Sequence, residues 1–312
     1  MAAYIARRFA SLLLTMFVVT IVIFALMHSV PGGPFSYVNS QQPLPPFAYE
    51  NILRKYGLDK PVWQQYLLWL WAVLHGDFGI PFESPTETVI GLIARAWPIT
   101  IRIGLITLAV AYVLGLTLGI VAAFKQNTWI DGATTFLATC GIVLPSFVVG
   151  FVLIDVFAVG LHWFPTGGCC EPKQYVMPVF AYMLGPMAGV ARYTRTSMLE
   201  VMRSEYVTMA RARGLPEWRV LRRYVLRTAL IPLITILGPD IPNVLTGSIF
   251  IEATFAIPGL GGYFTTASET RDYPMIMALV IMVSFLWGTL YLLSDLAYTI
   301  VDPRVRLEGL SR

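Results

Sequence analysis

The feature that most constrains this fold is the alternation of membrane-length apolar runs with short charged segments. Residues 9–27 carry no charged side chain and directly follow Arg7 and Arg8. A helix of about 20 residues crosses the roughly 30 Å hydrocarbon core of a bilayer. The 312-residue chain is 56% hydrophobic and 13% charged, which leaves too little polar surface for a soluble domain of this length. We therefore predict an all-α, polytopic membrane protein.

Six apolar stretches are long enough to cross the membrane as helices. They cover residues 9–27, 99–124, 133–159, 175–191, 229–251 and 274–300. The first run is too long for the core of a cleaved signal peptide, so we expect it to remain as a span. Lys and Arg concentrate in the segments that this arrangement places inside, which predicts cytoplasmic N- and C-termini. The third span contains Pro145, and we expect Pro232, Pro239 and Pro242 to break the fifth.

Residues 31–97 and 252–273 are the longest segments that we place outside. Residues 61–75 repeat apolar side chains at helical spacing and include Trp63, Trp69 and Trp71. Indole rings favour the membrane–water interface, so this segment is interpreted as a helix lying in that interface. A short buried helix under the outer loop is an equally open interpretation.

A basic segment, residues 192–227, separates two of the apolar runs. It holds nine arginines and three acidic residues. Its first part predicts a helix with Tyr206, Met209, Ala210 and Arg213 on one face, which ends at Gly214 because glycine tolerates the left-handed conformation. Pro216 suits the first position of a second helix, in which Trp218, Leu221 and Val225 share a face. The turn chemistry predicts a rigid pair of short helices on the cytoplasmic side rather than a passive connector.

This segment resembles the cytoplasmic coupling loop of membrane subunits from ATP-driven, binding-protein-dependent importers. Residues 205–216, Glu-Tyr-Val-Thr-Met-Ala-Arg-Ala-Arg-Gly-Leu-Pro, are similar to the oligopeptide and dipeptide branch of that family. The general family pattern is Glu-Ala-Ala, three residues and Gly, and only Ala210 and Gly214 match it. Short sequences along nearly the whole chain extend the resemblance, among them His75-Gly-Asp-Phe-Gly79, Leu144-Pro-Ser-Phe147, Arg271-Asp-Tyr273 and Asp302-Pro-Arg304.

The resemblance implies the fold of a type I ABC importer transmembrane domain with six helices and cytoplasmic coupling helices. It divides the chain into residues 1–93, a first helix with an extracytoplasmic segment, residues 94–301, the core domain, and residues 302–312, a tail. The implied partners are a homologous second permease subunit, two ATP-binding subunits, an extracytoplasmic peptide-binding protein and membrane lipid. The residues expected to couple to the ATPase subunits are Glu205, Ala210, Arg211, Arg213, Gly214, Leu215 and Pro216.

The sequence itself carries no catalytic motif. It lacks the Gly-x-x-x-x-Gly-Lys-Ser/Thr loop that cradles ATP phosphates, and its histidines and cysteines do not have metal-ligand spacing. We therefore predict no catalytic residue, no metal and no bound cofactor, with ATP and magnesium held by partner subunits. The small net charge of +4 lies mainly in cytoplasmic segments and gives no support to nucleic-acid binding.

Asp240 is the main polar feature within the predicted spans. A carboxylate in a membrane span is costly and faces a protein interior or an aqueous route. Asp240 either lines the pathway and attracts a substrate amino terminus, or satisfies backbone amides freed by Pro239 and Pro242. The pathway and outer-gate candidates are Asp240, Asn243, Thr246, Pro258 and Gly259.

Other functions remain open at this point. Within the same family the substrate could be a dipeptide, a nickel chelate, glutathione or an opine-like compound instead of an oligopeptide. An autonomous channel or ion-driven carrier would leave the cytoplasmic helix pair unexplained. An intramembrane aspartyl protease would have to use Asp155 and Asp240, and neither follows a glycine.

Overall fold

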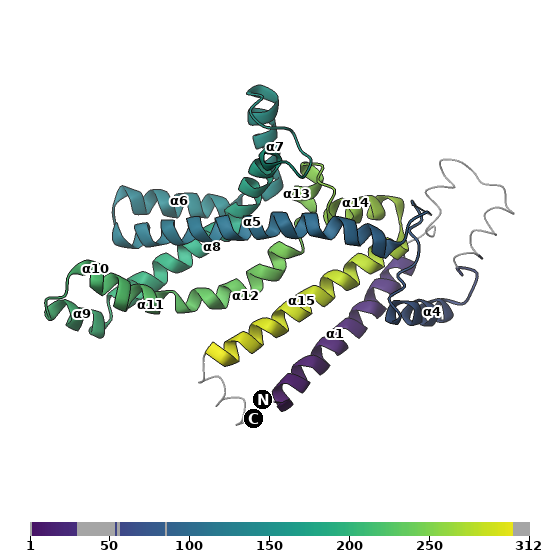
Figure 1. Ribbon diagram of the computed structural model, residues 1–312, viewed down its shortest axis with the longest axis horizontal. Helices are drawn as coiled ribbons and strands as arrows, with labels where there is room; N and C mark the ends of the chain where they lie inside the picture. The colour runs from purple at the N-terminus through teal and green to yellow at the C-terminus, as the bar shows by residue number, and fades with distance from the viewer. Residues whose placement is uncertain (1, 30–53, 55–56, 85, 302–312) are drawn as a thin grey trace. The chain divides into compact units, whose positions relative to one another are not determined.

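The computed structural model describes residues 2–29, 54, 57–84 and 86–301, and helices are the regular elements of these residues (Figure 1). They form two compact units, residues 1–98 with 258–312 (unit 1) and residues 99–257 (unit 2). Helix α5 (Val89–Phe124) contributes to both units. The division falls next to Pro98, which has no N–H to donate to a helical hydrogen bond. The all-α prediction is confirmed, whereas the predicted domain boundaries stay predictions.

Three described helices are long and apolar enough to cross a bilayer: residues Ala6–Ser29, Val89–Phe124 and Tyr273–Leu293. A fourth candidate is the pair formed by α6 (Trp129–Val143) and the segment Ser146–Gly160, which bends by 101°. The predicted third span is therefore not one straight crossing. Leu144 leaves the helical conformation (φ −76°, ψ 123°), as residues before a proline commonly do. These helices agree with six spans, and the full count stays a prediction.

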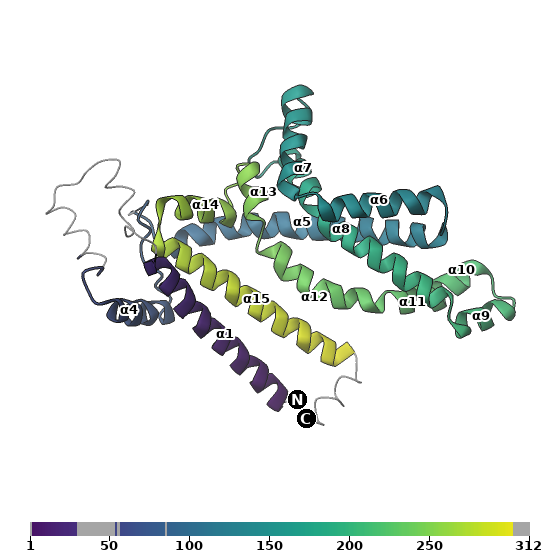
Figure 2. The ribbon, with the colours of Figure 1, turned by 180° about the vertical axis from the view of Figure 1, so that it is seen from behind.

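Unit 1 is built on α1 (Ala2–Ser29) and α15 (Tyr273–Val301), which lie side by side (Figures 1 and 2). Its buried core includes Ile23 and Phe24 of α1, Met275–Leu279 of α15 and part of α14 (Leu260–Thr270). Helix α4 (Val62–Leu74) has no buried residue, and Trp63 and Trp71 are 63% and 66% exposed. Tyr66 and Trp69 of the same helix are partly buried against the unit 1 core, so α4 is not fully buried, and both interpretations of this segment stay predictions.

Asp272 fixes the start of α15. Its Oδ1 accepts a hydrogen bond from the Met275 backbone N–H at 3.2 Å, and its Oδ2 accepts one from the Glu83 N–H at 3.2 Å. Burial raises the pKa of this carboxyl, and the backbone donors act in the opposite direction. The Arg271-Asp-Tyr273 sequence thus joins the helix start to the loop around Glu83 within unit 1.

Unit 2 is arranged around α8 (Pro172–Met202), against which α6 packs over much of its length (Figure 2). Glycines bring the neighbouring helices close to α8. A Cβ added at Gly115 or Gly119 of α5 would lie 2.7 and 2.6 Å from backbone oxygens of Met187 and Ala191. A Cβ at Gly141 of α6 would lie 2.7 Å from the Leu184 oxygen. Small residues at such positions are how membrane helices approach one another closely.

The fifth predicted span differs from its expected form. Helix α12 (Ile231–Leu245) continues through Pro239 and Pro242, because membrane helices tolerate proline when neighbouring groups satisfy the freed backbone. The chain breaks instead at Thr246 and Gly247, where Gly247 has φ +81°, before α13 (Ile249–Thr254). The predicted outer loop, residues 252–273, is mostly helical because it contains the end of α13 and all of α14.

Helix α5 also starts earlier than expected. Residues 89–98 are helical and precede the predicted start of the second span at Ile99. Helix α7 (Ser146–Leu153) continues into the wider π-helical turn Ile154–Gly160, and residues 161–171 form a non-helical loop before α8, between the third and fourth predicted spans.

Candidate functional site

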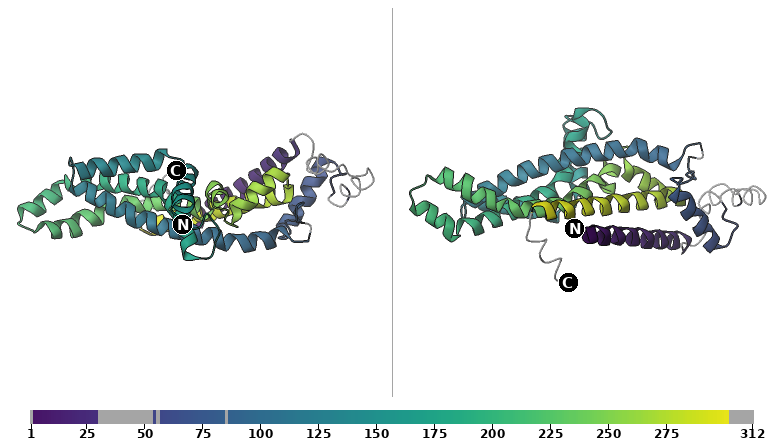
Figure 3. Two further views of the ribbon diagram at one scale, coloured as in Figure 1. Left: turned by 90° about the horizontal axis from the view of Figure 1, so that it is seen from above. Right: turned by 60° about the horizontal axis from the view of Figure 1, so that its bottom comes forward.

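The basic segment folds into two short helices, which we call the basic helix pair (residues 205–225). They are α9 (Glu205–Ala212) and α10 (Glu217–Val220), and α10 continues into the π-helical turn Leu221–Val225 before α11 (Leu226–Ala229). Figure 3 shows the pair at the end of unit 2 that the C-terminal part of α8 reaches. The predicted order of helix, turn and helix is confirmed.

A buried cluster anchors the basic helix pair to the rest of unit 2. Val207 and Ala210 of α9 are 0% and 4% exposed, and Val220 and Val225 are 0% and 1% exposed. They pack with Met198 of α8 and with other members of one core cluster, Ala123 and Ala229. Ala210 therefore faces the chain's own interior, and its small side chain serves packing at that point.

The sequence did not identify the two buried valines Val207 and Val220. The predicted face of the second helix contained Leu221 and Val225, which are four residues apart. In the structure the π-helical turn brings Val220 and Val225, five residues apart, into the same cluster. The signal that could have found Val207 is its spacing of three from Ala210.

Gly214 ends the first helix with φ +75°, and its N–H donates to the Arg211 carbonyl at 2.9 Å. No atom lies within 4 Å of where a Cβ would stand, so glycine is required for its conformation rather than for space. Pro216 was expected at the first position of the second helix, but it lies one residue earlier and directly precedes α10. Leu215 is half-buried against the same core cluster.

An ion pair bridges the turn. Arg211 Nε and Glu217 Oε1 are 2.7 Å apart, and the second guanidinium nitrogen lies 3.4 Å from Oε2. The side chains are 39% and 68% exposed, so we assign this pair at most about 1 kcal/mol. Its geometry nevertheless links α9 to α10 and supports a fixed shape for the turn.

The outer surface of the basic helix pair combines cations with exposed apolar side chains. Tyr206, Met209 and Trp218 are 43%, 56% and 60% exposed. The exposed cations of this surface are Arg213, Arg219, Arg222 and Arg223, and Glu205 is exposed in the first turn of α9. The Arg219 guanidinium lies 5.7 Å from the Trp218 ring centroid. This surface is suited to a partner with acidic residues and an apolar groove.

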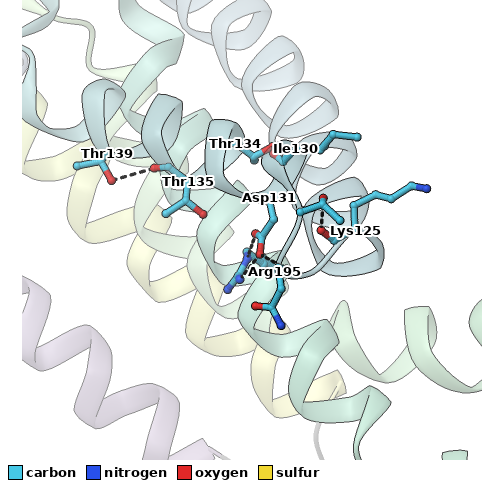
Figure 4. A network of polar contacts seen from close by, with 9 residues as sticks. Lys125, Ile130, Asp131, Thr134, Thr135, Thr139 and Arg195 are labelled. Atoms are coloured by element: carbon cyan, nitrogen blue, oxygen red, sulfur yellow. Dashed lines mark hydrogen bonds and ion pairs between the residues drawn. The ribbon is translucent and has the colours of Figure 1, made fainter.

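A partly buried ion pair joins α6 to α8 in the same unit, and no sequence pattern indicated it. Figure 4 shows Asp131 of α6 and Arg195 of α8 pointing toward one another. Arg195 Nε lies 2.5 Å from Oδ1, and its terminal nitrogen lies 2.7 Å from Oδ2. The Asn127 backbone N–H also donates to Oδ2 at 3.0 Å. The pair therefore ties the turn between α5 and α6 to α8, seven residues before α8 ends at Met202.

The pathway candidates lie in two places. Asp240 of α12 is half-buried and accepts a hydrogen bond from the Tyr112 hydroxyl of α5 at 2.9 Å. Its partner is thus a phenol from another helix. Asn243 is exposed, and its backbone carbonyl accepts hydrogen bonds from the Tyr182 hydroxyl at 3.1 Å and from Thr246 Oγ1 at 3.3 Å. Asp240, Asn243 and Thr246 share unit 2, whereas Pro258 and Gly259 precede α14 in unit 1. Their roles stay predictions.

Comparison with known proteins decides the family. Residues 115–307 match the model of the binding-protein-dependent transport system inner membrane component, which is more than half of the chain. The chain belongs to this family. Residues 1–104 match the N-terminal model of the membrane components of the same systems. This transport family is one of multi-pass inner-membrane proteins, in agreement with the apolar helices.

Two curated relatives cover almost the whole length of this family member. The dipeptide transport system permease protein DppB of Bacillus subtilis is 38% identical over 308 residues, 99% of each chain. The oligopeptide transport system permease protein OppB of Escherichia coli is 37% identical over 308 residues, 98% of this chain and 100% of the relative. A structure of the MetNI methionine ABC transporter aligns with a TM-score of 0.55 and 17% identity, over 68% of this chain and 97% of that chain. That likeness supports the fold.

Proposed function

We propose that this protein is the permease subunit of an ATP-driven importer that moves oligopeptides across the bacterial cytoplasmic (inner) membrane. The observation that carries the proposal is the match of 98–99% of the chain to permease proteins of peptide transport systems. The chain would form half of the translocation pathway beside a homologous second permease subunit. Its two termini would lie in the cytoplasm.

The basic helix pair is the proposed contact with one of the two ATP-binding subunits. Arg211, Arg213 and the exposed arginines of α10 would face acidic side chains on an ATPase subunit, and Met209 and Trp218 would enter an apolar groove. A contact that transmits motion must itself be stiff. The buried cluster, the Gly214 turn and the Asp131–Arg195 pair supply that stiffness.

The partners would supply the energy and the substrate. ATP and magnesium would be held by the ATP-binding subunits, so this chain would bind no cofactor and carry out no hydrolysis. An extracytoplasmic binding protein would deliver the peptide. Asp240 would then attract the peptide amino terminus. The Tyr112 hydroxyl, which donates to Asp240 Oδ2 at 2.9 Å, would orient the Asp240 carboxylate. Thr246, Asn243, Pro258 and Gly259 are the proposed pathway and gate positions.

A dipeptide is the second candidate substrate. The DppB and OppB relatives are 38% and 37% identical to this chain, so similarity supports both substrates equally. A channel or ion-driven carrier would give no role to a stiff cytoplasmic helix pair with an apolar, cationic surface.

Co-purification followed by an ATPase assay tests the proposal. The tagged chain is extracted in mild detergent, and hydrolysis is measured with and without binding protein loaded with peptides of two to six residues. Recovery of a second permease and ATP-binding subunits, with hydrolysis stimulated by loaded binding protein, supports the importer. A lone chain, under conditions in which a control importer stays assembled, contradicts it.

A further inference from the structure

The loop of residues 161–171, between the π-helical turn Ile154–Gly160 and α8, carries two adjacent cysteines, Cys169 and Cys170. Cys169 is half-buried, Cys170 is exposed, and both are free thiols. The predicted topology places this loop outside the membrane, between the third and fourth spans. The pair has no part in the proposed contact with the ATP-binding subunits or in the proposed pathway.

Hydrogen bonds hold the loop in place on both sides of the pair. The Gly168 N–H donates to the Phe255 carbonyl oxygen at 2.9 Å. The Glu171 N–H donates to Gln174 Oε1 at 3.0 Å, within the capping box at the start of α8. Cys170 itself has φ +86°, a conformation that is uncommon for residues other than glycine. The loop therefore presents the two thiols in a fixed arrangement, and a ligand that binds both has little chain to order.

The two thiols interact with each other. The hydrogen bond to Cys170, together with burial, raises the pKa of the Cys169 thiol, so this sulfur is protonated at neutral pH. Adjacent Cα atoms are about 3.8 Å apart, whereas disulfides usually join Cα atoms about 4.4–6.8 Å apart. A disulfide within the pair would therefore be strained, and strained disulfides are readily reduced. We expect the pair to persist as a dithiol.

The number of ligands decides what such a dithiol can hold. Structural zinc takes four protein ligands. In the part of the chain that the structure describes, no group of three or more Cys, His, Asp or Glu side chains is placed to hold a metal ion. Trivalent organoarsenicals of the form R–As=O need only two thiols, because the arsenic exchanges its oxygen for two sulfurs. The arsenic atom also lengthens the bridge between the sulfurs, so the constraint on a direct disulfide does not apply.

An apolar cavity adjoins the pair. Cys170 lines this cavity of about 570 Å³ between α5 and α8, together with Ile106 and Val110 of α5 and Val176 and Phe180 of α8. An aromatic substituent on the arsenic would lie against these apolar side chains and would be removed from water. A methyl substituent would leave most of the cavity unfilled. The cavity therefore favours an aromatic over a small substituent.

We propose that Cys169 and Cys170 bind aromatic trivalent arsenicals as a chelating dithiol, with the aromatic ring in the cavity between α5 and α8. Two As–S bonds form, the As=O bond breaks, and the oxygen leaves as water with the two thiol protons. Nothing is oxidised or reduced, so the step needs no further reactant. The proposal does not rest on peptide transport.

Intact-protein mass spectrometry of the full chain in mild detergent tests the proposal, with phenylarsine oxide as the probe. We expect wild type to bind one phenylarsine group per chain, which resists β-mercaptoethanol and is released by the dithiol dimercaptopropanol. Cys169→Ser and Cys170→Ser should each weaken binding about 100-fold, because the second attachment is lost. Cys140→Ser is the matched control, because Cys140 is a single half-buried thiol on α6, and it should bind as wild type does.

The substituent tests the cavity separately from the thiols. Phenylarsine oxide should bind wild type about tenfold more tightly than methylarsine oxide does. Val176→Phe, which fills the cavity, should remove this preference and retain methylarsine oxide binding.

The proposal is overturned if either Cys169→Ser or Cys170→Ser binds as wild type does, or if β-mercaptoethanol releases the phenylarsine group as readily as dimercaptopropanol does. Equal binding of the two arsenicals to wild type would overturn the placement of the ring in the cavity. A chain that lacks two reactive thiols when isolated without reductant would overturn the proposal as well, because the pair would then be a disulfide.

Discussion

Replacing Arg195 and replacing Asp131 should destabilise the protein by different amounts. The Asp131 side chain is 8% exposed and the Arg195 side chain is 29% exposed. Arg195→Ala leaves a buried carboxylate with the Asn127 N–H as its remaining donor. Asp131→Ala leaves a guanidinium that can reach water. The first variant should therefore be the less stable of the two.

The exposures set the size of the difference. Removing one partner of a fully buried pair costs about 3–5 kcal/mol. Because Arg195 is partly exposed, we expect about 2–3 kcal/mol for Arg195→Ala and about 1 kcal/mol for Asp131→Ala. At about 2 °C per kcal/mol for a chain of this size, the apparent Tm should fall by about 4–6 °C and about 2 °C. The double variant should resemble Asp131→Ala, since it holds no buried charge.

Thermal unfolding of the detergent-purified chain, followed by fluorescence, measures these shifts. Arg192→Ala is the control, because Arg192 is exposed on the same helix, and its Tm should change by about 1 °C at most. If Asp131→Ala lowers the Tm as much as Arg195→Ala does, then buried charge is not the cause. If neither variant differs from Arg192→Ala, then the pair does not anchor α6 to α8.

Substitutions at Gly214, Asp240 and Gly119 test the site and its support. Gly214→Val should lower the free energy of unfolding by about 1–2 kcal/mol, because valine is strained at φ +75°, whereas Gly214→Asn should be tolerated. Equal loss of binding-protein-stimulated ATPase activity in both variants would argue against a conformational role for Gly214. Gly214→Asp should uncouple hydrolysis from uptake while membrane insertion is retained, and normal uptake by this variant would contradict the coupling role. Asp240→Asn should slow uptake of a peptide with a free amino terminus about tenfold more than that of its N-acetylated form, and equal slowing would remove the amino-terminus role. Gly119→Leu should prevent the protein from folding, because the new side chain would collide with the Ala191 backbone oxygen. Gly132→Leu should accumulate in the membrane normally, because no atom lies within 4 Å of the Cβ position at Gly132.

Local chemistry predicted the basic helix pair well. Glycine at a helix end and proline at the start of the next helix act over a few residues, so the sequence alone placed Gly214 correctly and Pro216 to within one residue. The apolar runs likewise predicted α1, α5 and α15, because their length depends on the bilayer and not on neighbouring helices.

The features that were missed depend on contacts between distant residues. Asp131 and Arg195 are 64 residues apart, and nothing local indicates that they meet. The π-helical turn Leu221–Val225 brings Val220 into the core cluster beside Val225, so a period of 3.6 placed Val225 on the predicted face but missed Val220. Prolines were expected to break α12, but the break occurs at Gly247, whose positive φ the sequence pattern did not reveal.

Cross-linking of the basic helix pair to an ATP-binding subunit tests whether this pair is the contact with the ATPase. The native Cys140, Cys169 and Cys170 are first replaced by Ser. Met209→Cys on α9 is then compared with Trp163→Cys on the loop before α8, because the two native side chains have similar exposures of 56% and 62%. We predict that Met209→Cys cross-links to an ATP-binding subunit in membranes and that Trp163→Cys does not. Cross-linking from Trp163→Cys alone, or from neither position in an assembled complex, would contradict it.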